Sequence, residues 1–121
     1  MNLKKQIENR YSVFSMANLA TKTTGVQNAI IWVSVGETDG KKSTHGPRIK
    51  VVEGTNMTSA GLTMATVITI SGNPEVKRAG KIKNNIVKDA ILFVKQNKDT
   101  LLDYWNGQID TAELIQRIRP I

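Results

Sequence analysis

The fold is decided by residues 28–53, whose sequence is NAIIWVSVGETDGKKSTHGPRIKVVE. This segment contains two apolar, β-branched runs, residues 28–35 and residues 48–53, separated by a polar stretch rich in glycine. β-Branched residues favour strands, whereas a polar stretch with several glycines favours a loop. We therefore predict two neighbouring strands joined by a loop over residues 36–47.

The two runs are expected to use their faces differently. The first run has Ile31, Val33 and Val35 on one face and Ile30, Trp32 and Ser34 on the other. Apolar residues on both faces are typical of a strand that is covered on both sides. In the second run, Ile49 and Val51 are expected to point inward, and Arg48 and Lys50 outward.

The flanking segments predict a helix and a third strand. In residues 2–19, apolar side chains recur every three or four positions, which predicts a helix. Residues 63–71 form another β-branched run, which predicts a strand. Residues 75–83 are basic and lack a regular apolar pattern, so we expect this segment to be irregular.

Two helical patterns follow. Apolar residues from Ile82 to Val94 are spaced for an amphipathic helix, which either continues further or is followed by a new helix. Asp110 and Glu113 have the spacing of a capping box and predict the start of a final helix. Blocks of strands and helices indicate an α+β fold, with an N-terminal helix, a three-stranded antiparallel meander and C-terminal helices in a single domain over residues 1–121.

The composition is strongly basic. The 121 residues include 17 Lys and Arg against 10 Asp and Glu, which gives a formal net charge of +7. Residues 1–98 carry this surplus, whereas residues 99–121 contain more acids than bases. Such a charge favours anionic partners, although a surplus of lysine also keeps a small protein soluble. The absence of cysteine excludes disulfides, thiolate chemistry and cysteine-based metal sites.

Several other classes of function are disfavoured. No segment has the apolar length of a signal peptide or a membrane span, so a cytoplasmic protein without a membrane partner is expected. The run GKKS at residues 40–43 differs from a phosphate-binding P-loop, because Lys42 occupies the position of the Ser or Thr and a strand follows. The single His45 has no metal-ligand spacing and no orienting acid beside Ser43. We expect no metal, no cofactor and no enzymatic activity.

The loop and the second strand contain a candidate site for an anion. If the strands form a meander, the end of the third strand lies at the same edge of the sheet as the loop. The segment that leaves this strand is basic, so cations from two parts of the chain are expected to converge on one rim. The predicted ligand-binding residues are Lys41, Lys42, Ser43, Thr44, His45, Arg48, Lys50, Lys77, Arg78, Lys81 and Lys83.

These residue types suit a phosphate group. Arg48 is able to donate two parallel hydrogen bonds, while lysine acts as a mobile point charge. Gly36, Gly40 and Gly46 leave backbone N–H groups open to close approach, and the loop hydroxyls and His45 add further donors. The alternative interpretation is a mobile hairpin loop whose lysines are simply solvated.

Residues 29–51 resemble part of a group of phage proteins. The stretches IIWVS at residues 30–34 and HGPRIKV at residues 45–51 look like those of small uncharacterised proteins of tailed bacteriophages. The resemblance implies a protein of the host cytoplasm. Small phage proteins of this kind often bind or sequester a partner, including nucleotides and nucleic acid, and some inhibit host defence. The resemblance assigns no functional residues to this chain.

The sequence leaves three functions open. The first is non-enzymatic binding or sequestering of a phosphate-bearing ligand, a nucleotide or signalling nucleotide, in evasion of host defence. The second is nucleic-acid binding with low specificity through the same rim, and the third is inhibition by docking on an acidic host protein. A homo-oligomer is expected. Trp32 and Trp105 are interpreted as packing or subunit-contact residues, because aromatic residues are too sparse for a base-stacking sheet.

Overall fold

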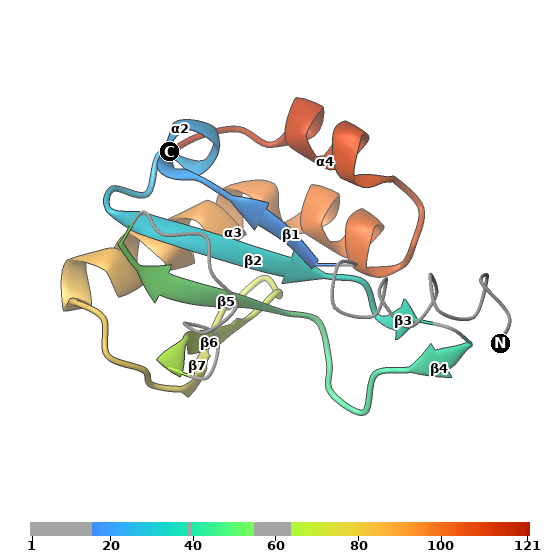
Figure 1. Cartoon of the computed structure of the whole chain (residues 1–121), viewed down its shortest axis with the longest axis horizontal. Helices are drawn as coiled ribbons and strands as arrows, with labels where there is room; N and C mark the ends of the chain where they lie inside the picture. The colour runs from blue at the N-terminus through green and yellow to red at the C-terminus, as the bar shows by residue number, and fades with distance from the viewer. Residues whose placement is uncertain (1–15, 39, 55–63) are drawn as a thin grey trace, which may run out of the picture.

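The computed structural model describes residues 16–38, 40–54 and 64–121. Within these residues the chain forms a five-stranded antiparallel sheet, a separate two-stranded hairpin and three helices (Figure 1). The strands are β1 (Met16–Leu19), β2 (Ala29–Ser34), β3 (Glu37–Thr38), β4 (Lys41–Lys42), β5 (Arg48–Glu53), β6 (Thr66–Thr69) and β7 (Val76–Arg78). The helices are α2 (Thr21–Thr24), α3 (Asn84–Trp105) and α4 (Thr111–Arg117).

The described part of the sheet is a meander in the order β1-β2-β5-β6-β7, and all of its neighbouring strands are antiparallel. The hairpin of β3 and β4 is inserted between β2 and β5. The predicted α+β class is therefore confirmed. The predicted three-stranded meander is too small, because β1 and β7 each extend the described sheet by one strand at an edge.

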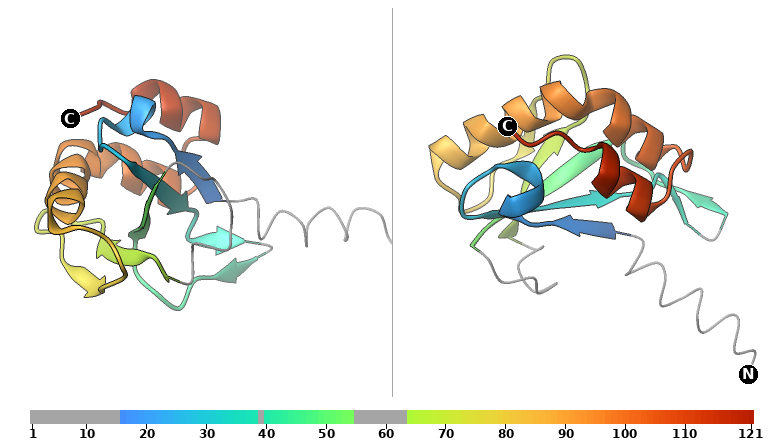
Figure 2. Two further views of the ribbon diagram at one scale, coloured as in Figure 1. Left: turned by 60° about the vertical axis from the view of Figure 1, so that its left-hand side comes forward. Right: turned by 90° about the horizontal axis from the view of Figure 1, so that it is seen from above.

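The central strands β2 and β5 alternate as predicted. Ile31 is the register partner of Val51, and Val33 is the partner of Ile49. All four side chains are buried in the core between the sheet and the helices, where each contributes about 1.5–3 kcal/mol. Helix α3 packs on β2 and β5, and α4 packs on α3, so both helices lie on the same side of the sheet (Figure 2).

The opposite face of the sheet carries a row of residues that crosses the five described strands. Asn18, Trp32, Lys50, Val67 and Arg78 are successive register partners. Directly opposite residues of antiparallel strands point to the same face. The row therefore places two cations and a tryptophan on one surface. Trp32 is only 7% exposed, which fits its predicted packing role.

The N-terminal helix predicted over residues 2–19 is wrong at its C-terminal end, where the chain forms β1. Ala17 and Leu19 are buried beside β2, while the residue between them is exposed. This period of two overrides the helical spacing because hydrogen bonding to the edge of β2 selects the extended conformation. Residues 1–15, the rest of the predicted helix, lie outside the described residues.

The third predicted strand, residues 63–71, corresponds to the shorter β6, and residue 63 lies outside the described residues. The expectation that residues 75–83 are irregular is wrong for β7, whose three residues are all exposed and so show no apolar alternation. The loop predicted over residues 36–47 contains the hairpin of β3 and β4. Gly40 in its turn has a φ of 75°, which glycine adopts without strain.

The sequence left open whether the amphipathic helix that contains Ile82 to Val94 continues further or is followed by a new helix. Helix α3 consists of two helical segments joined by a kink at Asn97, where the backbone is not helical (φ −113°, ψ 16°). The Asn97 side chain donates a hydrogen bond of 3.1 Å to the carbonyl of Phe93, four residues earlier, and so competes with the helical backbone. Helix α4 begins as predicted, with the side chain of Asp110 accepting a hydrogen bond of 2.8 Å from the N–H of Glu113.

The segment of residues 118–121 returns from the end of α4 to α2, where the C-terminus lies (Figure 1). The Asn97 side chain holds the backbone of Arg119 through two hydrogen bonds. The N–H of Ile121 donates to the carbonyl of Thr24 at 3.0 Å. This C-terminal segment thus joins α2 to the kink of α3.

Candidate anion-binding site

A small pocket of about 210 Å³ lies on the face of the sheet opposite α3, near the edge where the 36–47 loop joins β5. Three cations line it: Arg48 and Lys50 from β5, and Arg78 from β7. The other lining residues are Ser34, Ser43, His45, Val67 and Trp105. We call this cavity the basic pocket.

The sheet register brings the three cations together. Arg48 and Lys50 are two residues apart in β5 and therefore point to the same face. Val67 of β6 is the register partner of both Lys50 and Arg78, so these two cations are separated by one strand. Neighbouring strands are about 4.8 Å apart, so the two backbones are roughly 10 Å apart, within reach of two long side chains.

The basic pocket has no acidic residue in its described lining. Burial lowers the pKa of Lys50 below its ordinary value of 10.5, and the positive charges of Arg78 and then Arg48 lower this pKa further. None of the three ion pairs found among the described residues involves Arg48 or Lys50. An anion in the basic pocket would relieve this repulsion between like charges.

The loop side of the basic pocket is fixed to the end of α3. The N–H of Gly36 donates to the carbonyl of Trp105 at 2.7 Å, and the N–H of Ser43 donates to the carbonyl of Gly36 at 2.6 Å. The N–H of His45 in turn donates to the Ser43 hydroxyl at 3.1 Å. This series of hydrogen bonds positions Ser43 and His45 at the basic pocket, although both side chains are exposed.

A larger pocket of about 640 Å³ adjoins the basic pocket along the loop, and we call it the loop pocket. Its lining includes Ser43, His45 and Trp105, which the basic pocket also uses. The remaining lining residues are Val35, Gly36, Glu37, Gly40, Lys42, Asn106 and Gly107. The two pockets are therefore neighbours that share Ser43, His45 and Trp105.

The predicted convergence of cations is right for the loop edge and wrong beyond it. The end of β6 does reach the loop, because the N–H of Ile70 donates to the carbonyl of Pro47 at 2.9 Å. However, β7 then runs back along β6, away from this edge. Lys83 lies near the far end of β5, where its N–H donates to the carboxylate of Glu53 at 2.9 Å. Lys81, two residues earlier, is likewise beyond β7.

The remaining predicted residues divide into two groups. Lys42, Ser43, His45, Arg48, Lys50 and Arg78 line one or both pockets. Lys41 and Thr44 are exposed and outside the described lining of these pockets. Lys77 points elsewhere and forms an exposed ion pair with Glu75 at 3.5 Å.

Sequence reasoning missed Trp105 as a site residue. The predicted packing role agrees with the indole lying against Gly36, but Trp105 also lines both pockets. Its position depends on where the last turn of α3 meets the loop, a long-range contact that leaves no local pattern. Ser34 and Val67 were missed for the same reason, since each lies on a strand next to the basic residues.

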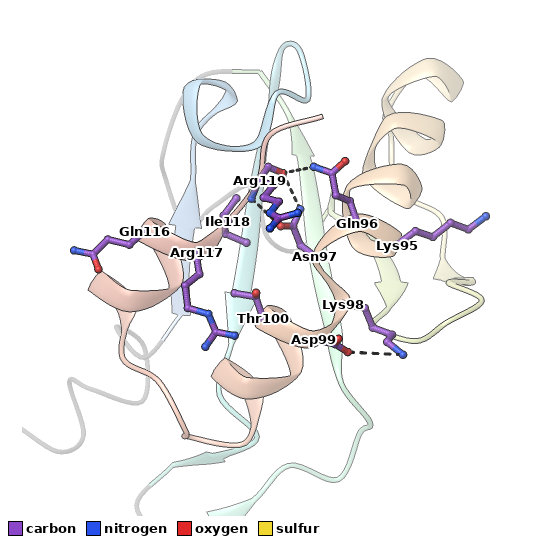
Figure 3. A pocket seen from close by; sticks show the side chains of 10 residues that line it. All are labelled: Lys95, Gln96, Asn97, Lys98, Asp99, Thr100, Gln116, Arg117, Ile118 and Arg119. Carbon is purple, nitrogen blue, oxygen red and sulfur yellow. Dashed lines mark hydrogen bonds and ion pairs between the residues drawn. The ribbon is translucent and has the colours of Figure 1, made fainter.

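A third pocket, of about 540 Å³, lies between the kink of α3 and the end of α4 (Figure 3). Several cations line it, but Lys98 is within 3.9 Å of Asp99 and Arg117 within 3.0 Å of Asp103. The Asn97 amide is already hydrogen-bonded to the protein backbone. The Asn97 amide therefore joins α3 to the C-terminal segment at this pocket.

Replacement of Lys50 by methionine tests the repulsion in the basic pocket. We expect Lys50→Met to raise the free energy of unfolding by less than about 1 kcal/mol at pH 7, because the side chain is half-buried and partly screened by solvent. A lowered pKa means that the charge destabilises the folded state below that pKa, and that this effect disappears as pH rises toward 10.5. Thermal unfolding at pH 7 and at pH 10 measures both effects.

Lys88→Met is the matched control, because Lys88 is exposed on α3 and outside the described lining of the three pockets. It should change the unfolding temperature little at either pH. A Lys50→Met variant that is less stable than the wild type at pH 7 would show that the Lys50 charge stabilises the fold.

Comparison with protein-family models, curated proteins and solved structures gave no match. Within the described ranges, no group of three or more potential metal-ligating side chains is present. None of the described helices has both the length and the apolar character needed to span a membrane.

Proposed function

We propose that this protein is a non-enzymatic binding protein that holds a phosphate-bearing ligand in the basic pocket. The observation that carries the proposal is the convergence of Arg48, Lys50 and Arg78 on a small cavity without an acid in its described lining. With the resemblance to small phage proteins, the proposed biological role is to sequester a nucleotide or signalling nucleotide of the host.

The chemistry of the basic pocket supports phosphate as the bound group. Arg48 presents a planar guanidinium that matches two phosphate oxygens, and Lys50 adds a point charge from the same strand. Partial burial strengthens these interactions, because the local dielectric is lower than that of water. Ser34 and Ser43 add hydroxyl donors at the same pocket.

Isothermal titration calorimetry with inorganic triphosphate tests the proposal. We expect the wild-type protein to bind triphosphate and Arg48→Ala to weaken the affinity at least tenfold, because charge-assisted hydrogen bonds contribute about 1.5–3 kcal/mol. Lys88→Ala removes the same charge from the outer side of α3 and serves as the control. Equal affinities for Arg48→Ala and Lys88→Ala would contradict a specific site and leave only a general charge effect.

A salt titration separates this proposal from nucleic-acid binding. One small anion contacts few cations, so its affinity should fall gently with salt concentration. A nucleic acid that spans the basic surface would release several counterions and lose affinity steeply. Tight binding of single-stranded oligonucleotides with a steep salt dependence, together with no binding of triphosphate, would favour the second function.

A further inference from the structure

We propose that the ligand is a nucleotide whose phosphates occupy the basic pocket and whose base stacks on Trp105 in the loop pocket. This inference rests on the proposed function and adds a second subsite to it. It is carried by the shared lining of the two pockets, by the difference in their charge and by the placement of Trp105.

The charge of the two pockets assigns an orientation to the ligand. The basic pocket is lined by three cations and by no described acid. The loop pocket contains one cation, Lys42, and one acid, Glu37, which are register partners in the hairpin of β3 and β4. Their opposite charges offset each other. The charged end of a ligand therefore belongs in the basic pocket, and an uncharged end belongs in the loop pocket.

Trp105 is already positioned for stacking. Its carbonyl accepts the hydrogen bond from Gly36, and its indole lies directly against that glycine, since a Cβ at Gly36 would be 2.5 Å from Nε1. The residue is only partly buried and borders both pockets. An aromatic ring held in place loses little entropy on binding a base, and stacking tolerates different bases.

The loop pocket has the space and polar groups that a base requires. Its volume of about 640 Å³ lies within the usual range for small-molecule sites. Gly40 and Gly107 both have positive φ, and a Cβ at either would meet no described atom within 4 Å, so open space surrounds them. Glu37 and Asn106 contribute a carboxylate and an amide, which suit the hydrogen-bonding edge of a base.

Calorimetry with the four nucleoside triphosphates and with inorganic triphosphate, all without divalent ions, tests the base subsite. We expect at least one nucleoside triphosphate to bind the wild type about tenfold more tightly than inorganic triphosphate does, the range typical of base stacking. Because Trp105 borders both pockets, Trp105→Leu should weaken binding of that nucleoside triphosphate by a clearly larger factor than binding of inorganic triphosphate. Trp105→Phe should keep most of the advantage of the nucleoside triphosphate, and a thermal melt checks that both variants fold.

The outcomes distinguish the two proposals. If the wild type binds inorganic triphosphate and all four nucleoside triphosphates equally well, the base subsite is wrong and the phosphate site stands. If Trp105→Leu weakens inorganic triphosphate and nucleoside triphosphates by the same factor, Trp105 only supports the pocket and the stacking role is again wrong. If the wild type binds none of these ligands, the proposed function fails together with this inference.

Discussion

Replacement of Gly80 by alanine is expected to lower the free energy of unfolding by about 3 kcal/mol. Gly80 follows β7 and lies against the start of β6, where a Cβ would be 2.1 Å from the carbonyl oxygen of Met64 and 2.8 Å from the nitrogen of Thr66. Both are backbone atoms, so one strand has to move. The N–H of Gly80 also donates to the Thr66 hydroxyl at 2.8 Å, and displacement of the backbone would lengthen this bond. Chemical denaturation measures the change.

Gly72→Ala is the matched control for this variant. Gly72 lies in the connection between β6 and β7, and a Cβ there meets no described atom within 4 Å. Its replacement should change stability by no more than about 0.5 kcal/mol. Displacement of β7 would also move Arg78, so Gly80→Ala should weaken triphosphate binding while Gly72→Ala does not. Equal stability of the two alanine variants would mean that β7 does not pack on β6 in this way.

Replacement of Asn97 by alanine is expected to have an effect of similar size, a loss of about 3 kcal/mol. Asn97 is 3% exposed, and its amide donates to the carbonyls of Phe93 and Arg119 and accepts from the N–H of Arg119 (Figure 3). Alanine would remove the acceptor of the part-buried hydrogen bond that the N–H of Arg119 donates. Equilibrium unfolding in urea measures the loss, and amide exchange at Arg119 reports the local opening.

Gln96→Ala provides the comparison at the neighbouring position. Gln96 also donates to the carbonyls of Arg119 and Pro120, at 2.8 and 3.0 Å, but it is exposed and water is able to replace it. We expect a loss below about 1 kcal/mol. If the two variants lose the same amount of stability, burial of the Asn97 amide is not what stabilises the C-terminal segment.

The central strands were predictable because the residue types along them follow the burial of each face of the strand. In β5, the buried Ile49 and Val51 alternate with Arg48 and Lys50, and in β2 the β-branched run is buried on both faces, as expected for a central strand. The edge strands were not predictable in the same way. β7 is exposed at every residue, so no alternation of apolar and polar side chains indicates its backbone pairing with β6.

The candidate site was predictable only for residues that lie close together in the sequence. Arg48 and Lys50 share a strand and a face, so their proximity followed from the period of two. Lys81 and Lys83 were misplaced because β7, which the sequence did not indicate, reverses the chain before them. Trp105 was missed because its contact with Gly36 joins segments that are far apart in the sequence.

The contacts of the C-terminal segment and those of the meander differ in sequence separation, which affects when each forms during folding. Each strand of the described meander pairs with the strand before it, so the sheet grows by closing loops between elements that are near one another in the sequence. The bond between Ile121 and Thr24 instead closes a long loop, from residue 24 to residue 121. We therefore expect the hairpins to form before the rate-limiting barrier and the C-terminal segment to dock after it. Weakening that segment would then speed unfolding and leave the folding rate almost unchanged.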